Sequence, residues 1–294
     1  MFTMHNARRA ALGAATAALA ASATFAFPFF GDWTGPTNLE ALPGSSPNIN
    51  TPAVDGCASL SADRLTIAFT SNRTGNFDIY VATRPNLNSG FGNPVPLPAQ
   101  INGPTNEACP TILPDRIYFS SDRDDPAYDL YVSRRIGNSW SPAMRLGPNV
   151  NTPGRLEESA ATYSAGGHEI MLFSSRYPDG SDGKIYQSVD GGPKSLIIGG
   201  PNQSGSNNRP SISADGRTIY FDSDRYGTLG GPDLYFATRP VPFGAFGPAQ
   251  HLTSLSSAAF DARPFISTDG QMLTFSSARP GSTSPAPDIW FAAR

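Results

Sequence analysis

Acidic residues recur along this chain at intervals of 49 to 54 positions, each just ahead of a short repeated phrase. In the fourth repeat an amide replaces the carboxylate, so the set reads Asp55, Glu107, Glu158, Asn207 and Asp261. Carboxylates held close together raise one another's pKa, which is how such sites obtain a proton donor and a base at neutral pH. A catalytic interpretation makes Glu107 and Glu158 the acid and the base, with Asp55 and Asp261 as supporting carboxylates.

The same residues also fit a structural role. They belong to the repeat itself, and a repeated carboxylate can hold units together by accepting backbone N–H groups or by pairing with arginine. Arg209 and Arg263 follow two members of the set, where they would hold an acidic ligand beside Asn207. The residue types leave both interpretations open.

A second set of charges follows the same period. Arginines end one predicted strand of every repeat, and the next strand begins with an acidic residue or, in the third repeat, a lysine: Arg73, Arg123, Arg176, Arg225 and Arg279 against Asp78, Asp129, Lys184, Asp233 and Asp288. Guanidinium–carboxylate pairs would fix these hairpins in one geometry, so we expect a scaffold role. The third repeat leaves Arg176 without a carboxylate, which predicts unpaired positive charge or, with Lys184, a site for an anionic ligand.

The phrases that carry these charges have the pattern of short strands. The fullest copy, RPSISADGRTIYFDSDR, begins at Arg209, and the other copies begin 52, 51, 49 and 54 residues apart at Cys57, Cys109, Ala160 and Arg263. Runs of β-branched and aromatic residues separated by Gly-containing turns indicate four strands per repeat, and a period near 50 indicates propeller blades. The sequence predicts an all-β fold, a single five-bladed β-propeller of four-stranded blades over residues 27–294.

The two ends of the chain predict how the ring closes. The last copy stops at Arg294 after its third strand, and a segment resembling the fourth strands of the other repeats precedes the first copy, from Asp32 onward. We expect this N-terminal segment to join the C-terminal blade as its outer strand, because that pairing removes an open sheet edge.

The only two cysteines, Cys57 and Cys109, begin adjacent copies and should face the channel at one level. An even pair in an oxidising compartment is expected to form a disulfide, which adds about 2 to 4 kcal/mol of stability. Two reactive thiols or a metal site are the alternative. None of His5, His168 and His251 is expected at the channel mouth, which argues against a Ser-His-Asp hydrolase or a His-ligated metal.

Composition and local motifs give little sign of a cofactor or nucleic acid. The net charge is −3, and no Lys/Arg run could neutralise a phosphate backbone. The segment 179–183, Asp-Gly-Ser-Asp-Gly, resembles an oxygen-rich calcium loop, but it is too short to define a cage and fits an ordinary turn. We therefore expect no metal and no other cofactor.

The N-terminus predicts export. Arg8 and Arg9 precede an Ala-rich apolar run with small-residue exits near positions 21–26, so residues 1–26 are expected to be a signal peptide for the Sec or twin-arginine route. A transmembrane anchor is the alternative, although the run is only weakly hydrophobic. We expect a processed monomer without an anchor, in the periplasm or secreted.

The phrase S-x-D-G-x-x-I-Y-F-x-S-x-R followed by D-[IL]-Y resembles the WD40-like repeat of TolB-type propellers, from about Trp33 to Arg294. Unlike TolB, this sequence is expected to have no separate N-terminal domain. The resemblance implies a fold shared by protein-docking domains and polysaccharide lyases, and a central carboxylate ring is also similar to furanosidase-type glycoside hydrolases. We expect binding of a protein or glycan ligand at the channel-mouth face; a glycoside hydrolase or lyase is the alternative, and a purely structural role is the third.

Overall fold

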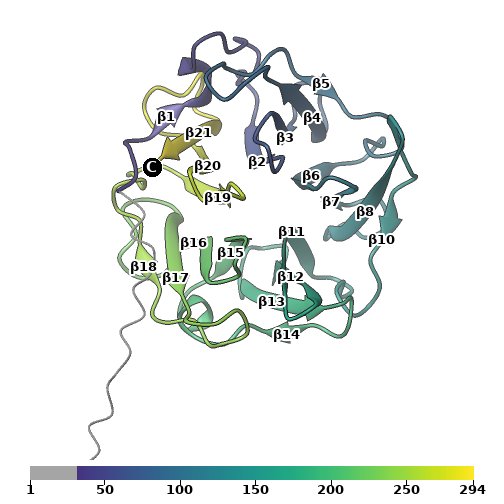
Figure 1. The fold of residues 1–294 in the computed structure, drawn as a ribbon, viewed down its shortest axis with the longest axis vertical. Coiled ribbons are helices and arrows are strands. Elements are labelled where there is room, and N and C mark those ends of the chain that lie inside the picture. The colour runs from purple at the N-terminus through teal and green to yellow at the C-terminus, as the bar shows by residue number, and fades with distance from the viewer. Residues whose placement is uncertain (1–31) are drawn as a thin grey trace, which may run out of the picture. The chain divides into compact units, whose positions relative to one another are not determined.

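The computed structural model describes residues 32–294. Five antiparallel sheets surround a central channel, and each runs from a long inner strand to a short outer strand at the rim (Figure 1). The protein is therefore a five-bladed β-propeller, as predicted from its repeat. Helical structure in this part of the chain is confined to two short 3-10 turns, η1 (Leu39–Ala41) and η2 (Gly200–Asn202).

Four blades use strands that are consecutive in sequence. Blade one contains β2 (Asp55–Leu60), β3 (Thr66–Ser71), β4 (Asp78–Thr83) and β5 (Val95–Pro96). Blade two contains β6 (Glu107–Ile112), β7 (Arg116–Ser121), β8 (Asp129–Ile136), β9 (Ser139–Trp140) and β10 (Met144–Arg145). Blade three contains β11 (Leu156–Ala165), β12 (His168–Arg176), β13 (Lys184–Val189) and β14 (Ser195–Leu196). Blade four contains β15 (Asn207–Ile212), β16 (Thr218–Ser223), β17 (Asp233–Thr238) and β18 (Gln250–His251).

The fifth blade joins the two ends of the described chain. It contains β19 (Asp261–Ile266), β20 (Met272–Ser277), β21 (Asp288–Ala293) and β1 (Thr37–Asn38). Thr37 lies opposite Phe291 and Asn38 opposite Trp290, which confirms the predicted closure by the N-terminal segment. Leu39, directly after β1, is fully buried in the cluster between blades five and one.

Apolar side chains fill the spaces between the blades. Each of the five interfaces has its own buried cluster, and each cluster contains the phenylalanine of one second strand: Phe69, Phe119, Phe173, Phe221 and Phe275. In four blades this ring stacks on a tyrosine of the third strand at centroid distances of 5.9 to 6.1 Å. The repeated aromatic residues of the phrase are thus explained by burial, which is the main stabilising contribution to such a fold.

A β-bulge in every inner strand determines which side chains meet in the channel. The pairing of the first two strands shifts register at the same place in all five blades. One residue of each bulge has a left-handed backbone with φ between 48° and 60°: Cys57, Cys109, Ser159, Arg209 and Arg263. Because a bulge re-aims a side chain, these five residues all line one small space on the channel axis.

The bulge corrects the predicted alignment of the third repeat. Ser159, not Ala160, is equivalent to the starting residue of the other copies. Ala161 pairs with Leu172, whereas the equivalent Ser211 pairs with Tyr220, so the first hairpin of blade three is two residues longer. The Gly-containing turn, on which the predicted alignment depended, therefore lies farther along the chain than in the other blades.

The predicted signal peptide, residues 1–26, lies outside the described residues. Within positions 32–294, none of the helical segments has the length and apolar character needed to span a bilayer.

Candidate functional site

Three of the predicted ring carboxylates are fully buried and surrounded by hydrogen-bond donors. Asp55 accepts from Thr51 N at 2.6 Å and from Arg73 Nη2 at 2.6 Å. Glu107 and Asp261 have the same arrangement with Arg123 at 2.9 Å and Arg279 at 2.5 Å, and each also accepts a backbone N–H from the loop before it. These contacts match the structural interpretation of the repeat, since each of these three carboxylates pairs with an arginine of its own blade.

The arginines at the ends of the second strands pair with this ring, and the predicted pairing with the third strand is wrong. The third-strand acids have other partners: Thr74 for Asp78, Arg145 for Asp129, His251 for Asp233 and Thr283 for Asp288. In blade four Arg225 donates to Asn207 Oδ1 at 2.6 Å, so the amide fills the carboxylate's structural place. The arginine pairs with the inner-strand residue and not with the third-strand acid, because in that position its guanidinium also lies over the stacked aromatic rings and donates to the loop before the blade.

Blade three keeps the ring but changes the residues that build it. Glu157, not Glu158, lies opposite Ser175 in the position that Asp55 occupies opposite Ser71. Lys194 supplies the cation: its Nζ lies 3.1 Å from Glu157 Oε1, donates to Val150 O and lies over the Phe173 ring, as the arginines do elsewhere. Burial raises the pKa of Glu157 even with Lys194 beside it.

This substitution leaves Arg176 free to point into the channel, where it meets Glu158. Arg176 Nε lies 3.1 Å from Glu158 Oε1, and Arg209 Nη1 lies 3.3 Å from the same oxygen. Arg209 is itself held by Asp222 through two hydrogen bonds of 2.8 and 2.6 Å. The position of Glu158 is occupied elsewhere by small or amide residues: Gly56, Ala108, Asn208 and Ala262.

Arg263 completes the cluster and lacks a full set of partners. Its Nε is buried and has no hydrogen-bond partner among the described residues. Arg176, Arg209 and Arg263 carry three positive charges, whereas Glu158 and Asp222 carry two negative ones, so the cluster has an excess positive charge. Burial, together with Arg209, lowers the pKa of Arg263 to about 10.

Glu158 itself is held in the charged form. Burial alone would raise the pKa of its carboxyl, but Arg209, Arg176 and Arg263 together hold that pKa below its ordinary range. A general acid at neutral pH needs the opposite shift. Glu158 is therefore suited to act as a counter-ion.

A cavity of about 170 Å³ opens above this cluster. Its lining is shared by four blades: Cys57, Thr70, Phe77, Ala108, Cys109, Ser120, Tyr128, Leu156, Glu158, Arg176 and Arg263. Glu158 is the one carboxylate in this lining. The cavity thus combines cationic, aromatic and hydroxyl groups.

A missing hydrogen bond between blades two and three accompanies the cavity. At the other four interfaces a second-strand side chain accepts the N–H of the next bulge residue, for example Thr70 from Cys109 N at 2.8 Å. The equivalent Ser120 Oγ is buried and has no partner in the described structure. Ser120 is one of the residues that line the cavity.

Tyr128 adds a strained residue to the cavity wall. Its φ of 71° is unusual for a bulky side chain, and Tyr128 N donating to Asp125 O helps to hold it. Burial, with Asp122 and Glu158 nearby, raises the pKa of its hydroxyl to about 12. Strained backbone of this kind clusters at functional sites.

The predicted disulfide is present inside the channel. Cys57 and Cys109 are bridged, with Cα atoms 4.8 Å apart. Cys109 Sγ lies 3.8 Å from Glu158 Oε2, so the bridge forms part of the cavity floor.

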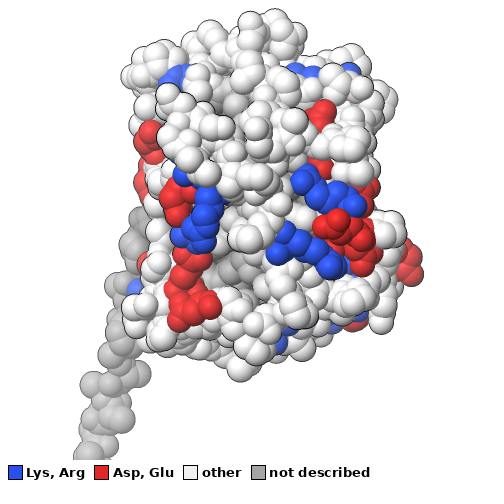
Figure 2. Space-filling model, turned by 90° about the vertical axis from the view of Figure 1, so that its right-hand side faces the viewer, with Lys and Arg blue, Asp and Glu red and all other residues white. Residues whose placement is uncertain are grey.

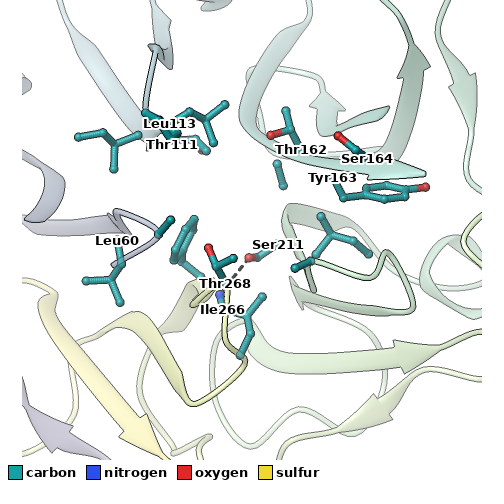
Figure 3. Close-up of a pocket in the computed structure, with 16 residues that line it drawn as sticks. Leu60, Thr111, Leu113, Thr162, Tyr163, Ser164, Ser211, Ile266 and Thr268 are labelled. Carbon is teal, nitrogen blue, oxygen red and sulfur yellow. Dashed lines mark hydrogen bonds between the residues drawn. The ribbon is translucent and has the colours of Figure 1, made fainter. Parts of the chain in front are cut away.

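The cavity at the opposite end of the channel has no charged side chain in its lining. A cavity of about 370 Å³ there is lined by apolar and hydroxyl side chains, among them Leu60, Leu113, Tyr163 and Ile266 (Figure 3). On the rim shown in Figure 2, basic and acidic side chains are interspersed. We call the two ends the charged mouth and the uncharged mouth, after the residues that line their cavities.

The structure brings together some of the predicted site residues and separates others. Glu158, Arg176, Arg209 and Arg263 meet at the charged mouth. Lys184 does not join them, because its Nζ donates to Gly205 O at 3.3 Å on an exposed edge. The adjacent acids Glu157 and Glu158 are the feature of the sequence that could have revealed this arrangement. Glu157 takes the ring position, and Glu158 is left to face the channel.

The loop that resembles a calcium site is engaged by protein groups. Asp179 accepts from Ser181 N at 2.8 Å, and Asp182 lies 3.3 Å from Arg155 Nη1. His168 pairs with Asp190 and His251 with Asp233. No cluster of three or more metal-binding side chains occurs among residues 32–294.

Comparison with known proteins gives a fold but no family. No family model matches the chain, and no curated protein matches it. It is similar to the α-L-arabinofuranosidase of Podospora anserina solved with cellotriose (11% identity, 89% of this chain and 96% of that one, TM-score 0.55). An endo-arabinase of Bacteroides thetaiotaomicron is also similar (15% identity, 84% and 96%, TM-score 0.54).

TolB from Acinetobacter baumannii is a further structural neighbour (17% identity, TM-score 0.51). The alignment covers 90% of this chain but 65% of the length of TolB. Identities this low establish a shared propeller fold, and the fold hosts both enzymes and binding proteins.

Proposed function

We propose that this protein is an exported propeller that binds a glycan at its charged channel mouth and does not cleave it. The observation that carries the proposal is the cavity at this mouth, whose lining includes two residues with a buried polar atom that has no partner in the described structure: Arg263 Nε and Ser120 Oγ. Unsatisfied buried groups of this kind are costly, so a bound polar ligand would stabilise them.

The number and state of the carboxylates favour binding over hydrolysis. Glycoside hydrolysis generally needs two carboxyl groups on either side of the scissile bond. Among the residues that line the described cavity, Glu158 is the one carboxylate, and three arginines hold its pKa below the ordinary value. Asp55, Glu107 and Asp261 are fully buried in their pairs with arginine.

The size and chemistry of the cavity favour a sugar over a protein surface. A volume of about 170 Å³ holds roughly five or six waters at ~30 Å³ each, which is the space of a single sugar ring. Phe77 and Tyr128 offer aromatic surface to such a ring. Two of the structural neighbours are named as carbohydrate-active enzymes, an α-L-arabinofuranosidase and an endo-arabinase.

The disulfide supports export, because such bridges persist in oxidising compartments. The location follows from the predicted signal peptide and is tested by sequencing the N-terminus of secreted protein, which should begin after residue 26. A mature chain that retains the leader would contradict it.

Binding and turnover are separated by one experiment with the wild-type protein. A panel of neutral and acidic oligosaccharides is incubated with the protein, bound sugar is measured by calorimetry, and products are followed by mass spectrometry. We expect at least one glycan to bind and to be recovered intact. New shorter products would contradict the non-catalytic role, and a panel without any binder would contradict glycan binding.

A further inference from the structure

We infer that the charged mouth recognises a carboxylate group on its ligand, so that the glycan unit bound there is an acidic sugar. This inference rests on the proposed function and specifies the chemistry of the same cavity. It starts from the charge of the cluster, in which three arginines face two carboxylates.

The individual contacts show which arginine remains available. Arg209 donates from all three of its guanidinium nitrogens, to Asp222 and Glu158. Arg176 shares Glu158 with it and lies 19% exposed at the cavity edge. Arg263 has a buried Nε without a partner and lines the cavity, so it is the group best placed to bind an incoming anion.

The residues around Arg263 fit a carboxylate that is attached to a polar group such as a sugar. A guanidinium matches a carboxylate through two parallel hydrogen bonds. Ser120 Oγ, also without a partner, supplies a further donor from another wall of the cavity. Phe77 and Tyr128 line the same space, where the ring of a sugar that carries the carboxylate would lie.

The cavity has room for about one sugar unit, and a longer ligand would extend out of it. A free carboxylate as small as acetate would leave most of the roughly 170 Å³ unfilled. An acidic sugar fills the space with its ring and places its charge near Arg263. An acidic peptide side chain is the competing carrier and is included in the test.

Three probes distinguish these possibilities in calorimetric titrations of the processed protein at low salt: glucuronate, glucose and acetate. We expect glucuronate to bind at least tenfold more tightly than either of the others, since hydrogen bonds to charged groups are the strong ones. Equal binding of glucose and glucuronate would overturn the acidic-sugar inference and leave glycan binding intact. Equal binding of acetate, or tighter binding of a glutamate-ended peptide, would overturn the sugar as carrier.

Two substitutions should change the affinity for glucuronate in opposite directions. Arg263→Gln should weaken glucuronate binding about tenfold or more and leave glucose binding unchanged. Glu158→Gln removes the competing carboxylate and should strengthen glucuronate binding, a gain that misfolding cannot produce. Arg134→Gln, at a side chain 57% exposed, is the control and should bind as wild type. Unchanged affinity in Arg263→Gln, or weaker binding in Glu158→Gln, would overturn the inference.

Discussion

At the scale of single residues, one exchange in blade three separates scaffold from site. Four blades hold their ring residue with the arginine that ends the second strand. In blade three Lys194 performs this role from the segment before β14, and Arg176 turns to Glu158 instead. The charged mouth exists because the third repeat carries a second acid, Glu158, and a second cation, Arg176, and these two residues meet Arg209 and Arg263 from blades four and five.

Replacing the lysine should show how much the ring depends on it. Lys194→Met leaves the buried Glu157 carboxylate without a cation, and breaking such a pair costs about 3 to 5 kcal/mol of unfolding free energy. In the folded protein the pKa of Glu157 is already above its ordinary 4.5. Ionisation of Glu157 therefore lowers the stability of the fold as the pH rises above about 4.5. The variant's deficit should therefore grow from about pH 4.5 toward pH 7 in urea unfolding.

The matched control is Lys184→Met, which removes a half-buried lysine of the same blade that pairs with no carboxylate in the described structure and should change stability by less than about 0.5 kcal/mol. A second variant, Lys194→Met with Glu157→Gln, removes the unpaired charge and should recover part of the loss. A deficit that does not vary with pH would show that Lys194 acts through packing alone.

At the scale of the strands, the bulges and the closure determine the shape of the channel. The left-handed bulge residues bring Cys57, Arg209 and Arg263 to one level, and β1 completes blade five. The closing segment is anchored by Leu39, which is fully buried against blades one and five. Its loss should weaken the whole ring, since a propeller blade cannot bury its faces alone.

Leu39→Ala tests this anchor. We expect a loss of about 2 to 5 kcal/mol in the free energy of unfolding, as for other large-to-small core substitutions. Leu196→Ala, at a leucine 50% exposed on an outer strand, should cost less than about 0.5 kcal/mol. Equal effects of the two substitutions would mean that the N-terminal segment does not hold the ring closed.

The sequence predicted the fold well because blade number, closure and disulfide depend on repeated local patterns. The period, the aromatic pairs and the position of Cys57 and Cys109 are visible without knowing any long-range contact. The site was predicted only in part, because it depends on a one-residue register. Because the first hairpin of blade three is longer, aligning the repeats by their turns places Glu158 where Glu157 belongs. Lys194, the cation that pairs with Glu157, lies outside the repeated phrase.

At the scale of the whole molecule, the channel has a cavity at each end, and the two cavities differ in chemistry. One mouth holds the three arginines, and the other is lined by apolar and hydroxyl side chains without a charged group (Figure 3). An acidic ligand should therefore enter from one side only. The two cavities therefore predict where in the channel an acidic ligand binds.

The most direct test is a crystal structure of the processed protein soaked with glucuronate. The account predicts the sugar above the Cys57–Cys109 bridge, with its carboxylate within hydrogen-bonding distance of Arg263 and its ring beside Tyr128. A sugar bound in the uncharged mouth or on the rim, with the charged mouth occupied by solvent alone, would contradict it.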